Sequence, residues 1–173
     1  MTNSALTVRE ALRYSNHDLL NHLHLIQMNL DLNRIEEAKL VIKQIAEQCN
    51  TFSNANKLGM PKTIEWLQTF EWRYPAIKLI LTSNVTRELS SKWDEAIEQY
   101  LEKTILHVYN TLDPFQDHSL TLHVHCDENV FWLDVKLVGA WQLKSIEMDN
   151  TNLTITTNEW TNTSWHYVLS IKE

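Results

Sequence analysis

One short polar segment, Arg13–Leu23, carries the adjacent residues His17 and Asp18 on an otherwise apolar predicted helix. An imidazole is largely neutral near pH 7, so a ring nitrogen of His17 can act as a nucleophile. The adjacent carboxylate of Asp18 could orient the ring or accept its proton. This chemistry suits the capture of a phosphoryl group, whereas the alternative interpretation is a solvated surface pair.

Metal binding is the rival interpretation, because His22 and His24 lie close to His17 in the chain. On a helix, His17 and His22 point about 140° apart, and His22 and His24 about 160° apart. His17 and His24 share a face, but they lie about 10.5 Å apart along the axis. This spacing argues against chelation. A second pair, His123 and His125, shares one face of a predicted strand, where a polar outer face is favoured over a metal site.

Apolar residues on a 3.6-residue period predict the helix that carries His17. It is expected to begin near Thr7, with Glu10 in the capping-box position, and to run to about Leu32. One seam of this helix consists of Leu12, Leu19, Leu23, Ile26 and Leu30, with Asn16 between the first two. His17 lies off this seam, so we expect its imidazole to be reachable from water.

A second helix is predicted after a short turn, with Asn33 as its cap and Glu36 at the third position. Its heptad seam consists of Ile35, Ala38, Ile42, Ile45, Cys49 and Phe52. Two such helices form an antiparallel hairpin that leaves apolar surface in water. A second copy of the chain would close a four-helix bundle, and the alternative is that the hairpin packs on the rest of its own chain.

The turn-rich stretch 53–62 marks a boundary and predicts two domains, residues 1–56 and 57–173. The second should contain a helix over 63–74 and a strand at 77–81, followed by a long helix that Ser90 or Ser91 caps and Pro114 ends. Further strands are expected near residues 119–126, 130–137, 151–157 and 165–171, and the segment 139–148 is ambiguous. The predicted fold class is α+β, with a mostly antiparallel sheet and helices on one face.

Composition excludes several functions. The formal net charge of -7 and the pI near 5.6 predict neither a nucleic-acid partner nor binding to an anionic membrane surface. The residues at the N-terminus contain no basic region that leads into an apolar core, so we expect a cytoplasmic protein. Two glycines, Gly59 and Gly139, leave no glycine-rich loop for a nucleotide phosphate, and Cys49 and Cys126 have no metal-ligand spacing.

The segment Ser15–Leu30 resembles the sporulation initiation phosphotransferase B family of spore-forming bacteria. The similarity consists of a Ser-x-His-Asp core, an Asn four residues after the His, a Leu-x-Leu-Ile run and the Asn-Leu that follows. In the rest of the chain the stretch Thr63–Trp72 is the best local match. The resemblance implies a helical hairpin that dimerises into a four-helix bundle. It also implies a C-terminal α/β sandwich domain like a degenerate histidine-kinase ATPase domain, without nucleotide binding.

The resemblance further implies a phosphorelay phosphotransferase. His17 would accept a phosphoryl group from the aspartate of one response-regulator receiver and pass it to a second, which controls the initiation of sporulation. Asp18 and Asn21 would orient the ring or contact the partner, and Leu20 and His24 would lie in the receiver's footprint. The chain itself would bind no cofactor, because the receiver brings Mg²⁺ and a lysine.

Two positions bear on this implied function. Asn16 stands where the family has a basic residue, so positive charge would come from Arg13 or from the partner. Asn110 lies near the position of a nucleotide-site asparagine in kinases. The alternative functions are an ATP-dependent histidine kinase fragment and a non-catalytic dimeric scaffold for response regulators.

Overall fold

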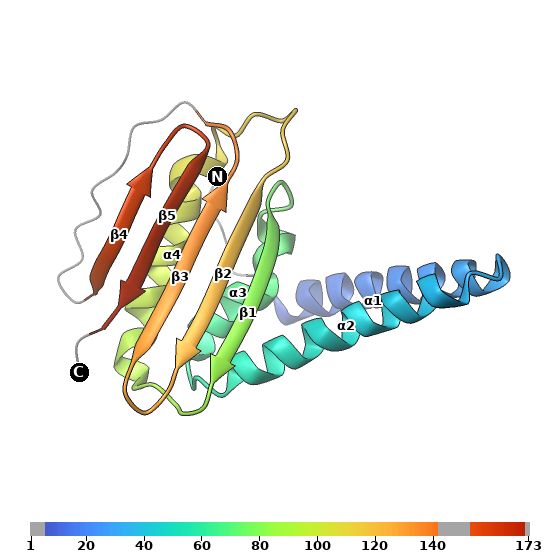
Figure 1. The fold of residues 1–173 in the computed structure, drawn as a ribbon, viewed down its shortest axis with the longest axis horizontal. Coiled ribbons are helices and arrows are strands. Elements are labelled where there is room, and N and C mark those ends of the chain that lie inside the picture. Colours follow the sequence, from blue (N-terminus) through green and yellow to red (C-terminus); the bar gives the residue numbers. More distant parts are fainter. Residues whose placement is uncertain (1–5, 142–152, 172–173) are drawn as a thin grey trace. The chain divides into compact units, whose positions relative to one another are not determined.

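The computed structural model describes residues 6–141 and 153–171. The chain forms two compact units, Met1–Asn50 and Thr51–Glu173, and their border falls inside helix α2 (Figure 1). The first unit is helical, and the second combines helices with a sheet, so the predicted α+β class is confirmed. The domain boundary expected at residues 56/57 stays a prediction.

Helix α1 spans Val8–Asp31, and a capping box stabilises its N-terminus as expected. The hydroxyl of Thr7 accepts a hydrogen bond from the Glu10 backbone N–H at 3.3 Å. The Glu10 carboxylate accepts hydrogen bonds from the Thr7 hydroxyl at 2.7 Å and from its backbone N–H at 2.9 Å. These bonds from Thr7 hold the pKa of Glu10 below its ordinary value. The predicted helix start at Thr7 is therefore confirmed.

The C-terminus of α1 ends in a Schellman motif, which corrects the expected role of Asn33. Asn33 has a left-handed backbone (φ 57°) and donates its N–H to the Leu30 carbonyl at 2.9 Å. The Arg34 N–H reaches back to the Asn29 carbonyl at 2.7 Å. Since α2 begins only at Ile35, Asn33 terminates the first helix and does not cap the second. Asparagine suits this position because it tolerates left-handed backbone better than most residues.

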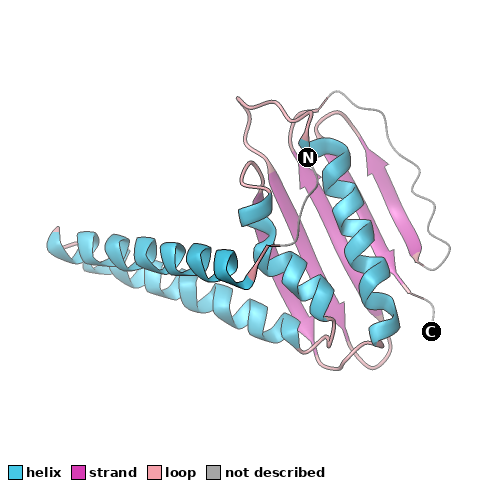
Figure 2. Cartoon of the chain, turned by 180° about the vertical axis from the view of Figure 1, so that it is seen from behind, coloured by secondary structure: helices cyan, strands magenta, loops and turns pink. Residues whose placement is uncertain are grey.

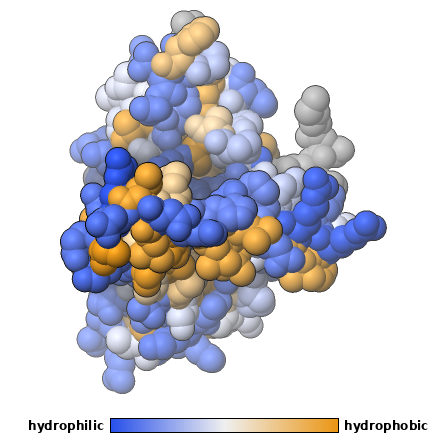
Figure 3. Space-filling model, turned by 90° about the vertical axis from the view of Figure 1, so that its right-hand side faces the viewer, coloured by the Kyte–Doolittle hydropathy of each residue, from blue (hydrophilic) through white to orange (hydrophobic). Residues whose placement is uncertain are grey.

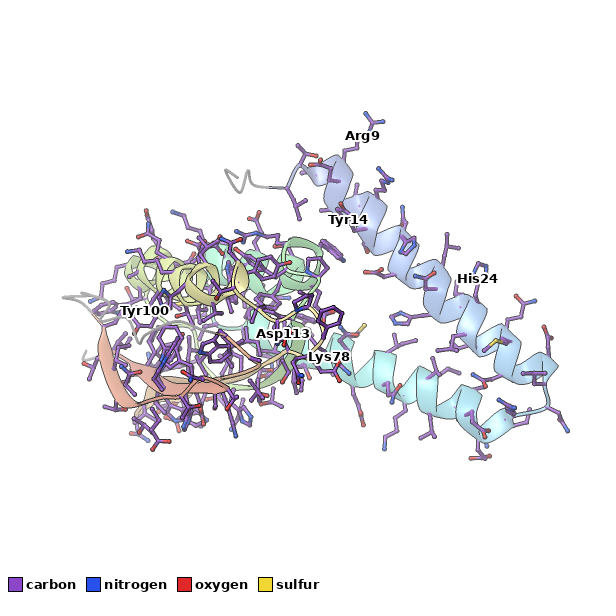
Figure 4. The ribbon with its side chains drawn as sticks, turned by 90° about the horizontal axis from the view of Figure 1, so that it is seen from above. Arg9, Tyr14, His24, Lys78, Tyr100 and Asp113 are labelled. Carbon is purple, nitrogen blue, oxygen red and sulfur yellow. The ribbon has the colours of Figure 1, made fainter. Side chains whose placement is uncertain are left out.

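Helix α2 spans Ile35–Asn56, and it diverges from α1 as both leave the turn (Figure 4). Among the described residues of the first unit, Asn29 and Ala38 alone are buried, and both lie near this turn. The α1 seam stays in water, with Leu12 59%, Leu19 54% and Leu23 51% exposed. Apolar side chains form a band along the hairpin surface (Figure 3). The single hairpin therefore leaves most of its apolar surface uncovered.

Within the described part of the second unit, five strands form one sheet in the order β1-β2-β3-β5-β4. Strand β1 runs parallel to β2, and the other neighbours are antiparallel, so the expected mostly antiparallel sheet is confirmed. The strands are β1 Lys78–Val85, β2 Ser119–Cys126, β3 Phe131–Val138, β4 Thr154–Trp160 and β5 Ser164–Ser170. Most of the ambiguous segment, residues 142–148, lies outside the described residues. The first two residues of the strand expected at 151–157 lie outside them as well.

Helices α3 (Pro61–Arg73) and α4 (Asp94–Tyr109) cover one face of the sheet (Figure 2). A short 3₁₀ helix, Ser91–Trp93, precedes α4, so the α-helix begins later than the sequence suggested. Ser90 occupies the N-cap position of this turn, but its side chain makes no capping hydrogen bond. The core between the helices and the sheet includes Phe70, Leu101, Leu122, Val135 and Tyr167. Alternate strand residues point into this core, as the period-2 pattern of β2 and β3 requires.

Two acidic residues of α4 hold α3 in place. The buried carboxylate of Asp94 accepts hydrogen bonds from the backbone N–H groups of Lys62 and Thr63 at 2.9 and 2.8 Å, so it caps the N-terminus of α3. The Glu102 carboxylate accepts hydrogen bonds from Trp66 Nε1 and Arg73 Nη2 at 2.7 and 2.6 Å. These bonds satisfy polar groups that packing removes from water.

The last turns of α2 belong to the second unit and cover part of the edge of β1. The Asn54 side-chain amide accepts a hydrogen bond from the Val85 N–H at 2.9 Å and donates one to the Val85 carbonyl at 3.2 Å. The Ser83 hydroxyl donates to the Thr51 carbonyl at 2.7 Å. One asparagine thus pairs with the edge strand as a neighbouring strand would.

Candidate functional site

Helix α1 presents His17 to water. The side chain of His17 is 70% exposed and that of Asp18 is 49% exposed. On the helical wheel, His17 lies roughly opposite the seam that contains Leu12 and Leu19. The capping box at Thr7 fixes the start of the helix, and therefore the direction in which His17 points. The expected accessibility of the imidazole is confirmed.

Two neighbours contact the same nitrogen of the ring. His17 Nδ1 lies 3.3 Å from Asp18 Oδ1 and 3.2 Å from Asn21 Nδ2. When Nδ1 carries the proton, it donates to the Asp18 carboxylate, and the Nε2 lone pair is left for nucleophilic attack. When Nε2 carries the proton, Nδ1 accepts from the Asn21 amide. The two contacts therefore favour opposite tautomers of His17.

The other ring nitrogen, Nε2, makes no hydrogen bond within the described residues. It is the nitrogen farther from the backbone, and the ring is mostly solvent exposed. The site therefore offers a nucleophile held through Nδ1, with a carboxylate ready to take the Nδ1 proton. In the Nδ1–H tautomer, Nε2 keeps a lone pair that faces water.

A shallow hollow runs along α1 beside His17. Arg13, Asn16 and Leu20 line it together with His17, as do Val8, Arg9 and Leu12. Of the expected supporting residues, Asp18 and Asn21 instead contact the ring directly. His24 is exposed two turns further along α1 and is not among the lining residues. Three of the expected residues thus share the hollow with His17.

Sequence reasoning missed Arg9. Its signal was the spacing of four residues from Arg9 to Arg13 and again to His17, which places the three on one side of a helix. The hollow brings Arg9 into the site.

In the described part of the chain, no group of three or more His, Cys, Asp or Glu residues could hold a metal ion. His125 has a carboxylate neighbour that the sequence analysis overlooked, since its Nε2 lies 3.1 Å from Asp127 Oδ2. The ring of His125 also stacks on Trp132, with 4.9 Å between centroids. Backbone N–H groups of Asn129 and Val130, and then His125, lower the pKa of Asp127. These contacts give His125 a structural role on the sheet.

Two further features concern Asn110 and the hydropathy of the helices. Asn110 is exposed and forms the C-cap of α4, where its backbone N–H donates to the Val108 carbonyl. Among the helices that the structure describes, none is both long enough and apolar enough to cross a bilayer.

Residues 1–58 match the family model of the sensor kinase SpoOB-type, alpha-helical domain. This match supports the interpretation that the chain is a protein of two-component signalling. The match covers helices α1 and α2, and it supports the family resemblance of the hairpin.

Two other comparisons were made. Among solved structures, the histidine kinase AdeS of Acinetobacter baumannii is 13% identical, with a TM-score of 0.39 over 90% of this chain and 96% of that chain. A comparison with curated proteins found no match.

Proposed function

We propose that this chain is a histidine phosphotransferase that carries a phosphoryl group between two response regulators, in a relay that controls the initiation of sporulation. The observation that carries the proposal is the exposed His17, contacted at Nδ1 by Asp18 and Asn21 with Nε2 open to water. A carrier must accept a phosphoryl group from one large partner and give it to another. An exposed nucleophile on a helix surface meets that need.

The transfer step is a displacement at phosphorus. In the Nδ1–H tautomer, the Nε2 lone pair of His17 attacks the phosphorus of an aspartyl phosphate, and the bond from phosphorus to the aspartate oxygen breaks. The aspartate leaves as a carboxylate. The imidazole gains positive charge, and Asp18 stabilises it or takes the Nδ1 proton. The reverse sequence delivers the phosphoryl group to the second receiver.

The receiver would supply part of the positive charge and the metal ion that the transfer needs. In this proposal the receiver brings Mg²⁺ and a lysine to its own aspartate, while the chain supplies the nucleophile and a docking surface. Arg13, Asn16 and Leu20, which line the hollow beside His17, would be part of that surface. Asn21 would hold the ring when Nε2 carries the proton.

The working form would be a homodimer. The α1 seam is about half exposed at Leu12, Leu19 and Leu23, and on α2 Ile42 is 52% exposed. A second copy would cover these residues in a four-helix bundle, since burial of such apolar surface favours association by about 25 cal/mol per Å². His17 would stay on the outer surface, because it lies away from the seam.

Phosphotransfer from a labelled receiver tests the proposal. Purified aspartyl-phosphate receiver is mixed with wild-type protein, with His17→Gln and with His22→Gln, and a parallel reaction contains labelled ATP without receiver. We expect acid-labile, base-stable label on the wild type and on His22→Gln, and at least a hundredfold less on His17→Gln. His22 is the matched control, because it is a histidine on a different face of the same helix.

Other outcomes would support the alternatives. Label from ATP alone would make the chain a histidine kinase fragment, and label from neither source would leave the scaffold function. Full label on His17→Gln would place the acceptor elsewhere and overturn the proposal.

A further inference from the structure

A row of positive charge leads along α1 to His17. Arg9, Arg13 and His17 follow one another at four-residue spacing, which corresponds to about 6 Å along the axis and about 40° around it per step. All three line the hollow, whose remaining lining is mainly apolar. Arg9 projects from α1 on the side away from α2 (Figure 4).

Neither guanidinium group forms a hydrogen bond or an ion pair within the part of the chain that the structure describes. The nearest acid in sequence, Glu10, has its carboxylate engaged by Thr7 at 2.7 Å, and Arg13 acts on Glu10 only through a weak charge effect. Both arginines are exposed. They are therefore available to an external anion.

The charge is distributed unevenly about His17. From Tyr14 to Asn33 the chain has no lysine or arginine, while it carries Asp18 and Asp31. The whole chain has a formal net charge of -7, so the pair Arg9 and Arg13 is a local departure from its acidic surface. An acidic partner would be attracted to the side of His17 that faces the start of α1.

We propose that Arg9 and Arg13 form a basic docking row for the acidic face of the receiver that exchanges phosphate with His17. This inference rests on the proposed function. An aspartyl phosphate is strongly anionic, and a site that holds Mg²⁺ beside it needs further carboxylates. Arginine is suited to such groups, because its planar fork binds carboxylate and phosphate oxygens in pairs. The receiver would thus dock along the row from Arg9 through Arg13, with its phosphoryl group directed at His17.

Transfer rates at two salt concentrations test the docking row. The variants are Arg9→Gln, which removes a charge near the start of α1, Arg34→Gln, which removes the same charge from the turn after α1, and Arg9→Lys, which keeps the charge. At about 0.05 M salt we expect kcat/KM for Arg9→Gln to fall by about threefold or more, mainly through KM, and the gap to close near 0.5 M salt. Arg34→Gln should stay within about twofold of wild type, and Arg9→Lys should recover part of the loss.

The outcomes separate this inference from the proposed function. Wild type that takes label from the receiver, with Arg9→Gln equally fast at low salt, would overturn the docking row alone. An equal loss of kcat/KM in Arg34→Gln would show that the effect depends only on the net charge of the chain, and it would also overturn the docking row. Wild type that takes no label from the receiver would overturn the proposed function itself. Far-ultraviolet circular dichroism checks that Arg9→Gln keeps its helix content.

Discussion

The ring of His17 is held at one nitrogen and free at the other. Asp18 and Asn21 compete for Nδ1 at nearly equal distances, 3.3 and 3.2 Å, and the tautomer decides which of them is bonded. A nucleophile needs the tautomer in which Nδ1 donates to Asp18, because only then does Nε2 keep its lone pair. The balance between these two neighbours should therefore set the reactive fraction of His17.

Asp18→Asn is predicted to slow transfer. An asparagine oxygen can still accept from Nδ1, but it cannot take the proton or neutralise the charge that forms on the ring, so we expect a rate about tenfold to hundredfold lower. Single-turnover transfer from a labelled receiver measures this loss. Asp31→Asn, the same change at the far end of α1, is the control, and an Asp18→Asn protein with wild-type rates would contradict the assigned role.

Helix ends show how the elements are stabilised. Thr7 and Glu10, three residues apart, cap α1 through reciprocal hydrogen bonds between side chain and backbone. The N-terminus of α3 has no capping side chain of its own and receives Asp94 from the start of α4. One buried carboxylate thus joins the two helices that cover the sheet, since it also accepts from the Thr63 hydroxyl at 2.8 Å.

Asp94→Ala should destabilise the second unit by about 1–3 kcal/mol, because two backbone N–H groups at the start of α3 would lose their acceptor. Urea unfolding followed by tryptophan fluorescence measures this unit selectively, as all seven tryptophans lie beyond residue 51. Asp117→Ala removes an exposed carboxylate and is the control. Equal unfolding midpoints for the two variants would show that the cap contributes little.

The two units bury their apolar residues to very different degrees. The second unit has a continuous core between its sheet and two helices. In the first, residues such as Leu12, Leu23 and Ile42 remain about half exposed. A hairpin with this much exposed apolar surface is suited to association.

Ile42→Glu is predicted to prevent association of two chains. Ile42 is 52% exposed in the single chain, so a charge there is compatible with the monomer, whereas burial of that charge in a bundle would cost several kcal/mol. Sedimentation velocity at micromolar concentration should show dimeric wild type and monomeric Ile42→Glu. Gln44→Glu adds the same charge at an exposed polar position and should stay dimeric. A monomeric wild type would rule out the bundle.

Much of this protein could be predicted from the sequence, because the decisive interactions are short. The capping box at Thr7, the seam of α1 and the exposed His17 each depend on residues within one or two helical turns. The alternation in β2 and β3 likewise predicted which face of each strand is buried. Local patterns of this kind predicted the fold class and the exposed position of His17.

Tertiary structure decided what joins distant parts of the chain. The pairing of Asn54 with Val85 and the cap from Asp94 to α3 each link residues about thirty apart, and no local pattern specifies such partners. The left-handed Asn33 was also misjudged, because the same residue type favours helix starts and left-handed helix ends. The sequence alone determined that His17 lies on α1 away from the apolar seam. Only the folded chain decided that Asp94 caps α3 and that Glu102 bonds Trp66 and Arg73, because three-dimensional packing brings together side chains that lie far apart in the chain.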